Sequence, residues 1–126
     1  MRTAGEFSNT VRSGARSGRR NVVLYARSRI EEGAEARSRF GFIVSKAVGN
    51  AVARNLVKRR LRAVAAEALV NQGHTYDVVV RALPSAAQAT WAELSVEVSE
   101  AITAACRAAD RKATTQRSGR DNHGIS

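Results

Sequence analysis

Short segments in which apolar residues alternate with polar or small ones mark the strands of this chain. In the segment FGFIVS, which begins at Phe40, aromatic and β-branched residues alternate with smaller ones, a pattern that favours a strand. We expect this central strand to have little solvent on either face. Other apolar runs predict a strand over residues 21–27, in which Tyr25 shares a face with Val23, and a strand over residues 76–81. An extra edge strand is predicted near residues 15–20.

A long helix is predicted over residues 51–70, directly after the central strand. Asn50 is a good N-cap, because its side-chain oxygen can accept from the free N–H groups of the first turn, and no Gly or Pro follows until Gly73. At about 100° per residue, four apolar positions of this helix form one narrow stripe that can pack on a sheet. These positions are Val57, Leu61, Val64 and Ala68.

Two further helices are predicted from capping boxes. Thr3 and Glu6 match such a box before a short helix that Gly14 closes. Thr90 and Glu93 match a second box, which opens a helix near the C-terminus. The apolar stripe of that last helix comprises Trp91, Leu94, Val98, Ala101, Ile102 and Ala105.

These elements predict one small α+β domain with helices packed on a mainly four-stranded sheet. The chain has 126 residues, a mass of 13.6 kDa and 44% hydrophobic residues, which suits a single core. We expect the domain to cover residues 1–110. The polar segment 111–126 lacks periodicity and is predicted to be a disordered basic tail. The acidic segment 28–38 is predicted to be an exposed hairpin connection.

The net charge of +10 and the sequence pI of about 11.3 indicate a polyanionic partner. No Asp or Glu occurs between Glu35 and Glu67, so the cations of the long helix have no acidic neighbour one turn away. A solvated helix face is the alternative interpretation, but such faces usually mix signs. The polar residues on this arc of the helix are Arg54, Asn55, Lys58, Arg59 and Arg62.

The sequence offers no catalytic or metal-binding cluster. His74 and His123 have no second ligand at metal spacing, and the 11 acidic residues are scattered. Asp77 is predicted to be a surface residue rather than a base. Cys106 is the only cysteine and is expected to be a packed thiol, which fits a reducing compartment. No apolar run reaches the roughly 20 residues that span a bilayer, and we expect a cytoplasmic protein with no membrane partner.

The segment from the central strand into the long helix resembles the signature of the bacterial ribonuclease P protein component. In that family a strand ending in Val-Ser-Lys leads through a Gly corner into a helix with Arg-Asn-Arg-x-x-Lys-Arg-type residues. The chain departs from the family pattern at Leu56, where a second Arg is frequent, and at Ala47, where a Lys is common. It keeps Arg39, Gly41, Val44, Ser45, Lys46, Gly49, Ala51, Val52, Arg54, Asn55, Lys58, Arg59 and Arg62.

The resemblance covers about residues 2–109 and implies the order α-β-β-β-α-β-α, with a left-handed crossover around the central helix. It implies that a catalytic RNA carries the chemistry with bound Mg²⁺, held mainly by the RNA and the substrate, and removes the 5′ leader from precursor transfer RNA. The polypeptide alone is not expected to be catalytic, and no obligate protein partner is inferred. By the same resemblance, Lys46, Arg54, Asn55, Lys58, Arg59 and Arg62 bind the catalytic RNA. Phe7, Val11 and Tyr25 are the implied leader contacts, although Val11 stands where many members have an aromatic.

Two other functions remain open from the residues alone. The charge equally permits a structural or ribosomal RNA-binding protein without a processing role. An autonomous metal-dependent nuclease or a DNA-binding helix module is the third candidate. Cleavage without RNA, or preference for duplex DNA, would identify that last class.

Overall fold

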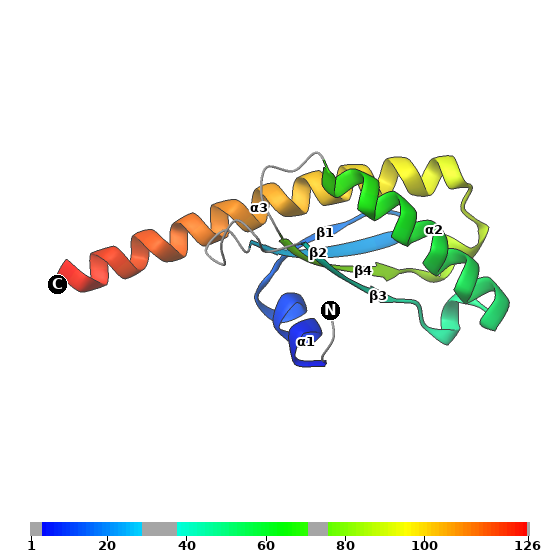
Figure 1. Ribbon diagram of the computed structural model, residues 1–126, viewed down its shortest axis with the longest axis horizontal. Helices are drawn as coiled ribbons and strands as arrows, with labels where there is room; N and C mark the ends of the chain where they lie inside the picture. The colour runs from blue at the N-terminus through cyan, green and yellow to red at the C-terminus, as the bar shows by residue number, and fades with distance from the viewer. Residues whose placement is uncertain (1–3, 29–37, 71–75, 126) are drawn as a thin grey trace.

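The computed structural model shows three layers, with two long helices on one face of a sheet and a short helix on the other (Figure 1). It describes the backbone of residues 4–28, 38–70 and 76–125, and the side chains of residues 8–28, 38–68 and 76–112. The helices are α1 (Ala4–Ser13), α2 (Ala51–Val70) and α3 (Trp91–Ile125), with 3-10 turns η2 (Lys46–Val48) and η3 (Pro84–Gln88). The strands are β1 (Ala15–Gly18), β2 (Val22–Ser28), β3 (Arg39–Ile43) and β4 (Tyr76–Ala82). This order confirms the predicted α+β class and element sequence.

The sheet has the strand order β1-β2-β4-β3. β2 pairs antiparallel with both β1 and β4, whereas β3 lies parallel to β4 at the edge. Parallel neighbours need a crossover connection, and here α2 supplies it. The crossover that the family resemblance implies is therefore present, and its hand stays a prediction.

The hairpin expected over residues 28–38 is wrong, because the two strands that this segment joins are not neighbours. β4 lies between β2 and β3. On this side β2 therefore pairs with residues about 50 positions or more later in the chain, as Arg27 opposite Asp77 illustrates. Residues 29–37 lie outside the described residues. Sequence proximity favoured a hairpin, but the longer apolar strand β4 takes the central place in the sheet.

The core lies between the sheet and the two long helices. The face of the sheet that meets it carries Leu24 of β2 and Val80 of β4, both fully buried. The apolar stripe predicted for residues 51–70 is confirmed, with Val57, Leu61 and Val64 buried and Ala68 packed against the core. The stripe of α3 is confirmed from Leu94 to Ala105.

Trp91 departs from that prediction, since it is 50% exposed. It is the first residue of α3, directly after the cap formed by Thr90, whose Oγ1 accepts from the Glu93 N–H at 3.1 Å. The Glu93 carboxylate accepts in return from the Thr90 N–H at 3.3 Å, which confirms the predicted capping box. The stripe therefore begins to meet the core only one turn further on, at Leu94.

β3 is less buried than predicted, because it is an edge strand. Gly41 is buried, but the other four residues of the strand are only half-buried. Phe40 and Phe42 pack against the core, and their rings stack with centroids 6.0 Å apart. An edge strand has a neighbour on one side only, so its side chains stay partly open to solvent.

α3 continues as a helix to Ile125, where a disordered tail was expected from Arg111. The only proline of the chain is Pro84, so no proline stops the helix after residue 110. Near the point where the tail was expected, Asp110 accepts a hydrogen bond from the buried Tyr76 hydroxyl at 2.9 Å, which ties α3 to the start of β4. Burial and this hydrogen bond raise the pKa of the Tyr76 phenol.

Cys106 belongs to the same segment of α3, and its thiol is buried, as predicted. Burial, with a smaller contribution from the Asp110 charge, raises the pKa of Cys106 to about 12. The thiol is therefore neutral at physiological pH and acts as a small apolar core group.

Candidate nucleic-acid interface

The corner between η2 and α2 fixes where the basic helix begins. Gly49 has φ 154°, a backbone conformation that favours glycine, and a Cβ placed on it would lie 3.0 Å from the Ala53 Cβ. Asn50 caps α2 as predicted, because its Oδ1 accepts from the Ala53 N–H at 2.9 Å. The Gly-Asn pair thereby sets the direction in which the first turns of α2 present their side chains.

 The first turns of α2 and the end of β3 enclose a hollow with a volume of about 230 Å³. Three polar residues predicted to bind RNA line this hollow, namely Arg54, Asn55 and Lys58. Phe42 and Val44 form its apolar wall, a role that the sequence reasoning did not assign to them.

Arg54 differs from the rest of the arc because it is half-buried. Its Nε is shielded from solvent and has no hydrogen-bond partner among the described residues. A buried guanidinium N–H without a partner is costly, so this group favours an acceptor that the described residues do not supply. A phosphate oxygen is an acceptor that suits a guanidinium well.

The other predicted residues are exposed and lie around this hollow rather than in it. Arg62 places its guanidinium carbon 5.7 Å from the centroid of the Phe42 ring, a cation–π contact that leaves the side chain exposed. Lys46 lies on η2 and Arg59 on the exposed side of α2. The structure thus brings Arg54, Asn55 and Lys58 together and sets Lys46, Arg59 and Arg62 outside the hollow.

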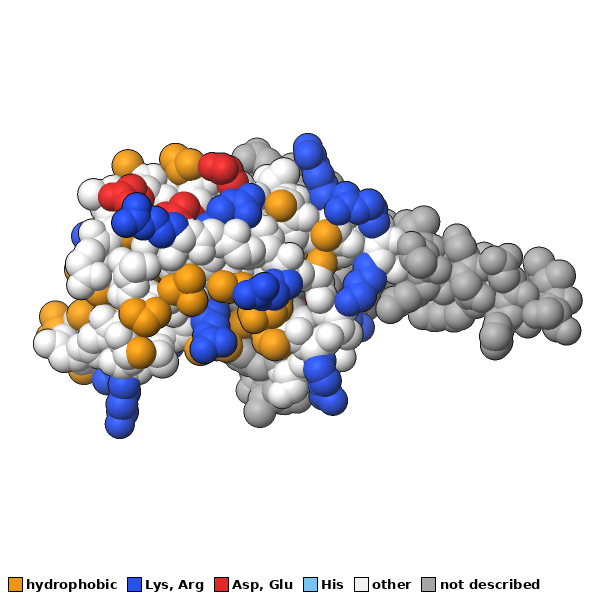
Figure 2. All heavy atoms as spheres, turned by 180° about the vertical axis from the view of Figure 1, so that it is seen from behind, with side chains coloured by type: hydrophobic (Ala, Val, Ile, Leu, Met, Phe, Trp, Pro, Cys, Tyr) orange, Lys and Arg blue, Asp and Glu red, His pale blue; other side chains and the backbone are white. Residues whose placement is uncertain are grey.

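The charge of α2 contrasts with that of α3. The acidic side chains in the view of Figure 2 gather over the first half of α3, which contains Glu93, Glu97 and Glu100. Glu97 uses its carboxylate inside the protein, since it accepts from the backbone N–H of the buried Asn21 at 2.8 Å. Of the two long helices, α2 is therefore the one that suits a polyanion.

The face of the sheet opposite the two long helices, called here the outer face, carries the remaining candidate residues. Strand alternation and register place these side chains together, since core-facing and outer residues alternate along each strand. The prediction that Tyr25 shares a face with Val23 is confirmed. The outer face comprises Arg16 and Gly18 of β1, Val23, Tyr25 and Arg27 of β2, Asp77, Val79 and Arg81 of β4, and Arg39, Gly41 and Ile43 of β3.

α1 packs on the outer face at close range (Figure 1). Thr10 of α1 is fully buried, and the Gly14 N–H donates to the Thr10 carbonyl oxygen at 2.8 Å. A Cβ on Gly14 would lie 2.8 Å from the Ala26 carbonyl oxygen and closer still to that of Thr10. Glycine at this position therefore allows the end of α1 to approach β2.

Beside α1 the outer face is hollowed, with a volume of about 360 Å³. Val11, predicted as a leader contact, lines this hollow together with Ser8, Arg12 and Ile43. Tyr25 is half-buried on the same face but does not line the hollow. The side chain of Phe7, the third predicted leader contact, lies outside the described residues.

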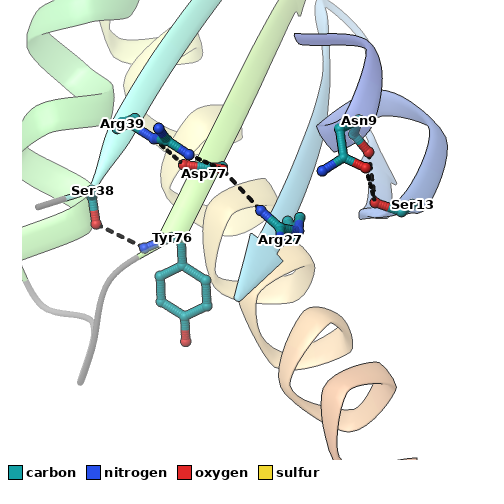
Figure 3. Close-up of polar contacts among 7 residues, drawn as sticks. All are labelled: Asn9, Ser13, Arg27, Ser38, Arg39, Tyr76 and Asp77. Atoms are coloured by element: carbon teal, nitrogen blue, oxygen red, sulfur yellow. Dashed lines mark hydrogen bonds and ion pairs between the residues drawn. The ribbon is translucent and has the colours of Figure 1, made fainter. Parts of the chain in front are cut away.

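Asp77 contradicts its prediction as a surface residue, since it is only 1% exposed. Its carboxylate accepts from Arg39 Nε and Nη2, both at 2.8 Å, and from Arg27 Nη1 at 3.3 Å (Figure 3). Each of the three strands contributes one of these residues to the outer face. Only the register across three strands, which local patterns do not determine, brings them together.

The described residues form no group of three or more His, Cys, Asp or Glu that could hold a metal ion. None of the helices, within the part of the chain that the structure describes, is long and apolar enough to cross a membrane.

Comparison with known proteins points to one family. Residues 1–106 match the family model described as Ribonuclease P. The chain is 56% identical over 107 residues to the ribonuclease P protein component of Kocuria rhizophila, covering 85% of this chain and 91% of that protein. It is 55% identical over 102 residues to the ribonuclease P protein component of Arthrobacter sp. (strain FB24), covering 81% of this chain and 73% of that protein.

Solved structures share the fold. The Staphylococcus aureus RNase P protein superposes with a TM-score of 0.64 at 24% identity, over 86% of this chain and 93% of that chain. The RNase P protein from Thermotoga maritima superposes with a TM-score of 0.63 at 18% identity, over 79% of this chain and 94% of that chain.

Proposed function

Because this chain belongs to the ribonuclease P protein component family, we propose that it binds RNA through two surfaces on opposite sides of its sheet. Ribonuclease P is an endoribonuclease that acts on precursor transfer RNA, and this protein is one of its subunits. Family membership favours this function over a structural or ribosomal RNA-binding protein.

The first proposed surface binds the catalytic RNA and consists of the basic arc of α2 with Lys46. The observation that carries this assignment is Arg54, whose Nε is buried without a partner among the described residues at the edge of a polar hollow. Exposed cations nearby, such as Lys58 and Arg59, add sequence-independent attraction to phosphates. Asn55 in the same hollow can donate from its amide and accept at its oxygen.

The second proposed surface binds the single-stranded 5′ leader of the substrate on the outer face. Tyr25 offers an aromatic ring on which an unpaired base can stack, while Val11 and Ile43 line an apolar hollow beside it. Arg16 and Arg81 project from the same face and are exposed. We include Phe7 in this surface on the family resemblance alone.

We propose that the RNA subunit and the substrate hold Mg²⁺, which would supply electrophilic stabilisation of the cleavage step. The donor set of this chain supports that assignment. The buried carboxylate on the outer face, Asp77, accepts from two arginines and is poorly placed to bind a cation. We also propose that the protein acts in the cytoplasm.

Reconstitution with the catalytic RNA tests the proposed function. Cleavage of precursor transfer RNA is measured across a Mg²⁺ titration, with and without this protein. We expect the protein to lower the Mg²⁺ concentration needed for cleavage, because its cations offset repulsion between the RNA subunit and the substrate. Binding to the catalytic RNA with no change in the Mg²⁺ requirement would contradict it.

A further inference from the structure

The ion network around Asp77 joins three strands at one end of the outer face. Arg27 of β2 and Arg39 of β3 both lie opposite Asp77 in the register of the sheet, one on each side of β4. Figure 3 shows the two guanidinium groups pointing from their strands toward the carboxylate between them. The side chain of Asp77 is 2% exposed, whereas those of Arg27 and Arg39 are 37% and 32% exposed.

Among the described residues, the Asp77 carboxylate is the group that draws the two cations together. Their strands are two strand spacings apart, roughly 10 Å, and like charges repel. The Arg39 contact is bidentate, through Nε and Nη2, so it fixes the plane of the guanidinium as well as its position. Asp77 therefore determines where both guanidinium groups lie on the outer face.

Stability alone is a weak explanation for this network. A buried carboxylate loses its hydration, and apolar residues of similar volume often replace buried ion pairs at no cost in stability. The neighbouring β4 residues Val78, Val79 and Val80 show that apolar side chains fill this part of the strand. The position of the network gives a different reason for it, because Tyr25 is the next outer residue of β2 before Arg27.

We infer that Asp77 is a positioning residue, which holds Arg27 and Arg39 as a fixed pair of guanidinium groups against a phosphate of the single-stranded leader. This inference rests on the proposed leader surface and extends it to the end of the outer face beyond Tyr25. Both arginines keep about a third of their side chain exposed while they bind Asp77, so they can contact a phosphate from the solvent side. A charge-assisted contact of this kind is geometrically specific in a way that mobile surface cations are not.

Asp77→Asn separates positioning from charge, because the two effects have opposite signs. The substitution raises the net charge by one, which by itself strengthens binding to any RNA. Loss of positioning instead weakens only the leader contact. Glu100→Gln is the matched control, since it makes the same charge change at an exposed position of α3.

The measurement is the affinity of the reconstituted holoenzyme for precursor transfer RNA with a leader and for mature transfer RNA. The ratio of the two affinities is the leader contribution. We expect Asp77→Asn to reduce this ratio roughly tenfold, as for one lost charge-assisted hydrogen bond, and Glu100→Gln to leave it unchanged. Thermal unfolding of each variant shows whether it is folded.

Arg27→Lys provides a second variant that retains Asp77 and the charge but removes the planar fork. If Asp77→Asn does not fold, this variant decides, and a reduced ratio supports the inference. An unchanged ratio in a folded Asp77→Asn protein, or in Arg27→Lys where that variant decides, overturns it. If the wild-type holoenzyme shows no leader contribution at all, the proposed leader surface fails as well, a result distinct from the failure of Asp77 alone.

Discussion

The two cationic surfaces of this domain are built in different ways. On α2 the exposed residues Lys58, Arg59 and Arg62 follow one another with no acidic residue before Glu67. On the outer face, by contrast, Arg27 and Arg39 share the buried carboxylate of Asp77. One surface presents cations without acidic neighbours on the helix, and the other holds its cations in a fixed geometry.

This difference matches the two kinds of RNA that the surfaces are proposed to meet. A structured catalytic RNA offers many phosphates, and a helix with exposed cations can bind it through additive, salt-sensitive contacts. A single-stranded leader is short and flexible, so binding it benefits from an aromatic ring and a preorganised pair of donors. The sheet keeps the two surfaces apart, because α2 covers one face and α1 the other (Figure 1).

The largest effect is expected when three cations of α2 are removed together. Replacing Arg54, Lys58 and Arg62 together by Ala should weaken binding to the catalytic RNA and flatten the salt dependence of this binding. The slope of log affinity against log salt should fall by roughly 2 to 3, since each phosphate contact contributes about 0.7 to 0.9. Affinity is measured at several salt concentrations.

The control for this triple variant removes three exposed cations from α3, namely Arg107, Arg111 and Lys112. It lowers the net charge equally but leaves α2 intact, so a smaller change in slope is expected. Equal changes in the two triple variants would show that net charge, rather than the arc on α2, accounts for binding.

A smaller effect, confined to the outer face, is expected from Gly14→Ala. The new Cβ would clash with the carbonyl oxygens of Thr10 and Ala26, so α1 must shift on the sheet. We expect a stability loss of about 1 to 3 kcal/mol and a reduced leader contribution, with unchanged affinity for the catalytic RNA. Denaturant unfolding and the two binding measurements check this.

Gly18→Ala is the control for that substitution, because a Cβ at Gly18 meets nothing within 4 Å. It should leave stability and both affinities close to those of the wild type. If Gly14→Ala weakened the catalytic RNA complex as much as the leader contact, the two surfaces would not be independent.

Local signals in the sequence predicted the elements well. α2 begins after Asn50 as expected, because an N-cap is a property of one turn and its side chain. The apolar stripe of α2 followed from helical periodicity, and the face shared by Val23 and Tyr25 followed from strand alternation. These features depend on residues close together in the chain.

Features that depend on strand order could not be predicted in this way. The placement of β4 between β2 and β3 made the expected hairpin wrong and buried Asp77 between two arginines. The hollow that contains Arg54 likewise depends on Phe42 and Val44, which a helical wheel of α2 does not include. The roles of the predicted RNA-binding residues stay predictions.

The separation of the two surfaces is tested most directly by Tyr25→Ala in the reconstituted holoenzyme. Affinity is measured for precursor transfer RNA with a leader of several nucleotides, for mature transfer RNA, and for the catalytic RNA alone. We expect a loss of about 1 to 3 kcal/mol for the leader-bearing substrate only, the value of one base stacked on an aromatic ring. Equal weakening of both substrates, or of neither, would contradict a leader surface on the outer face of the sheet.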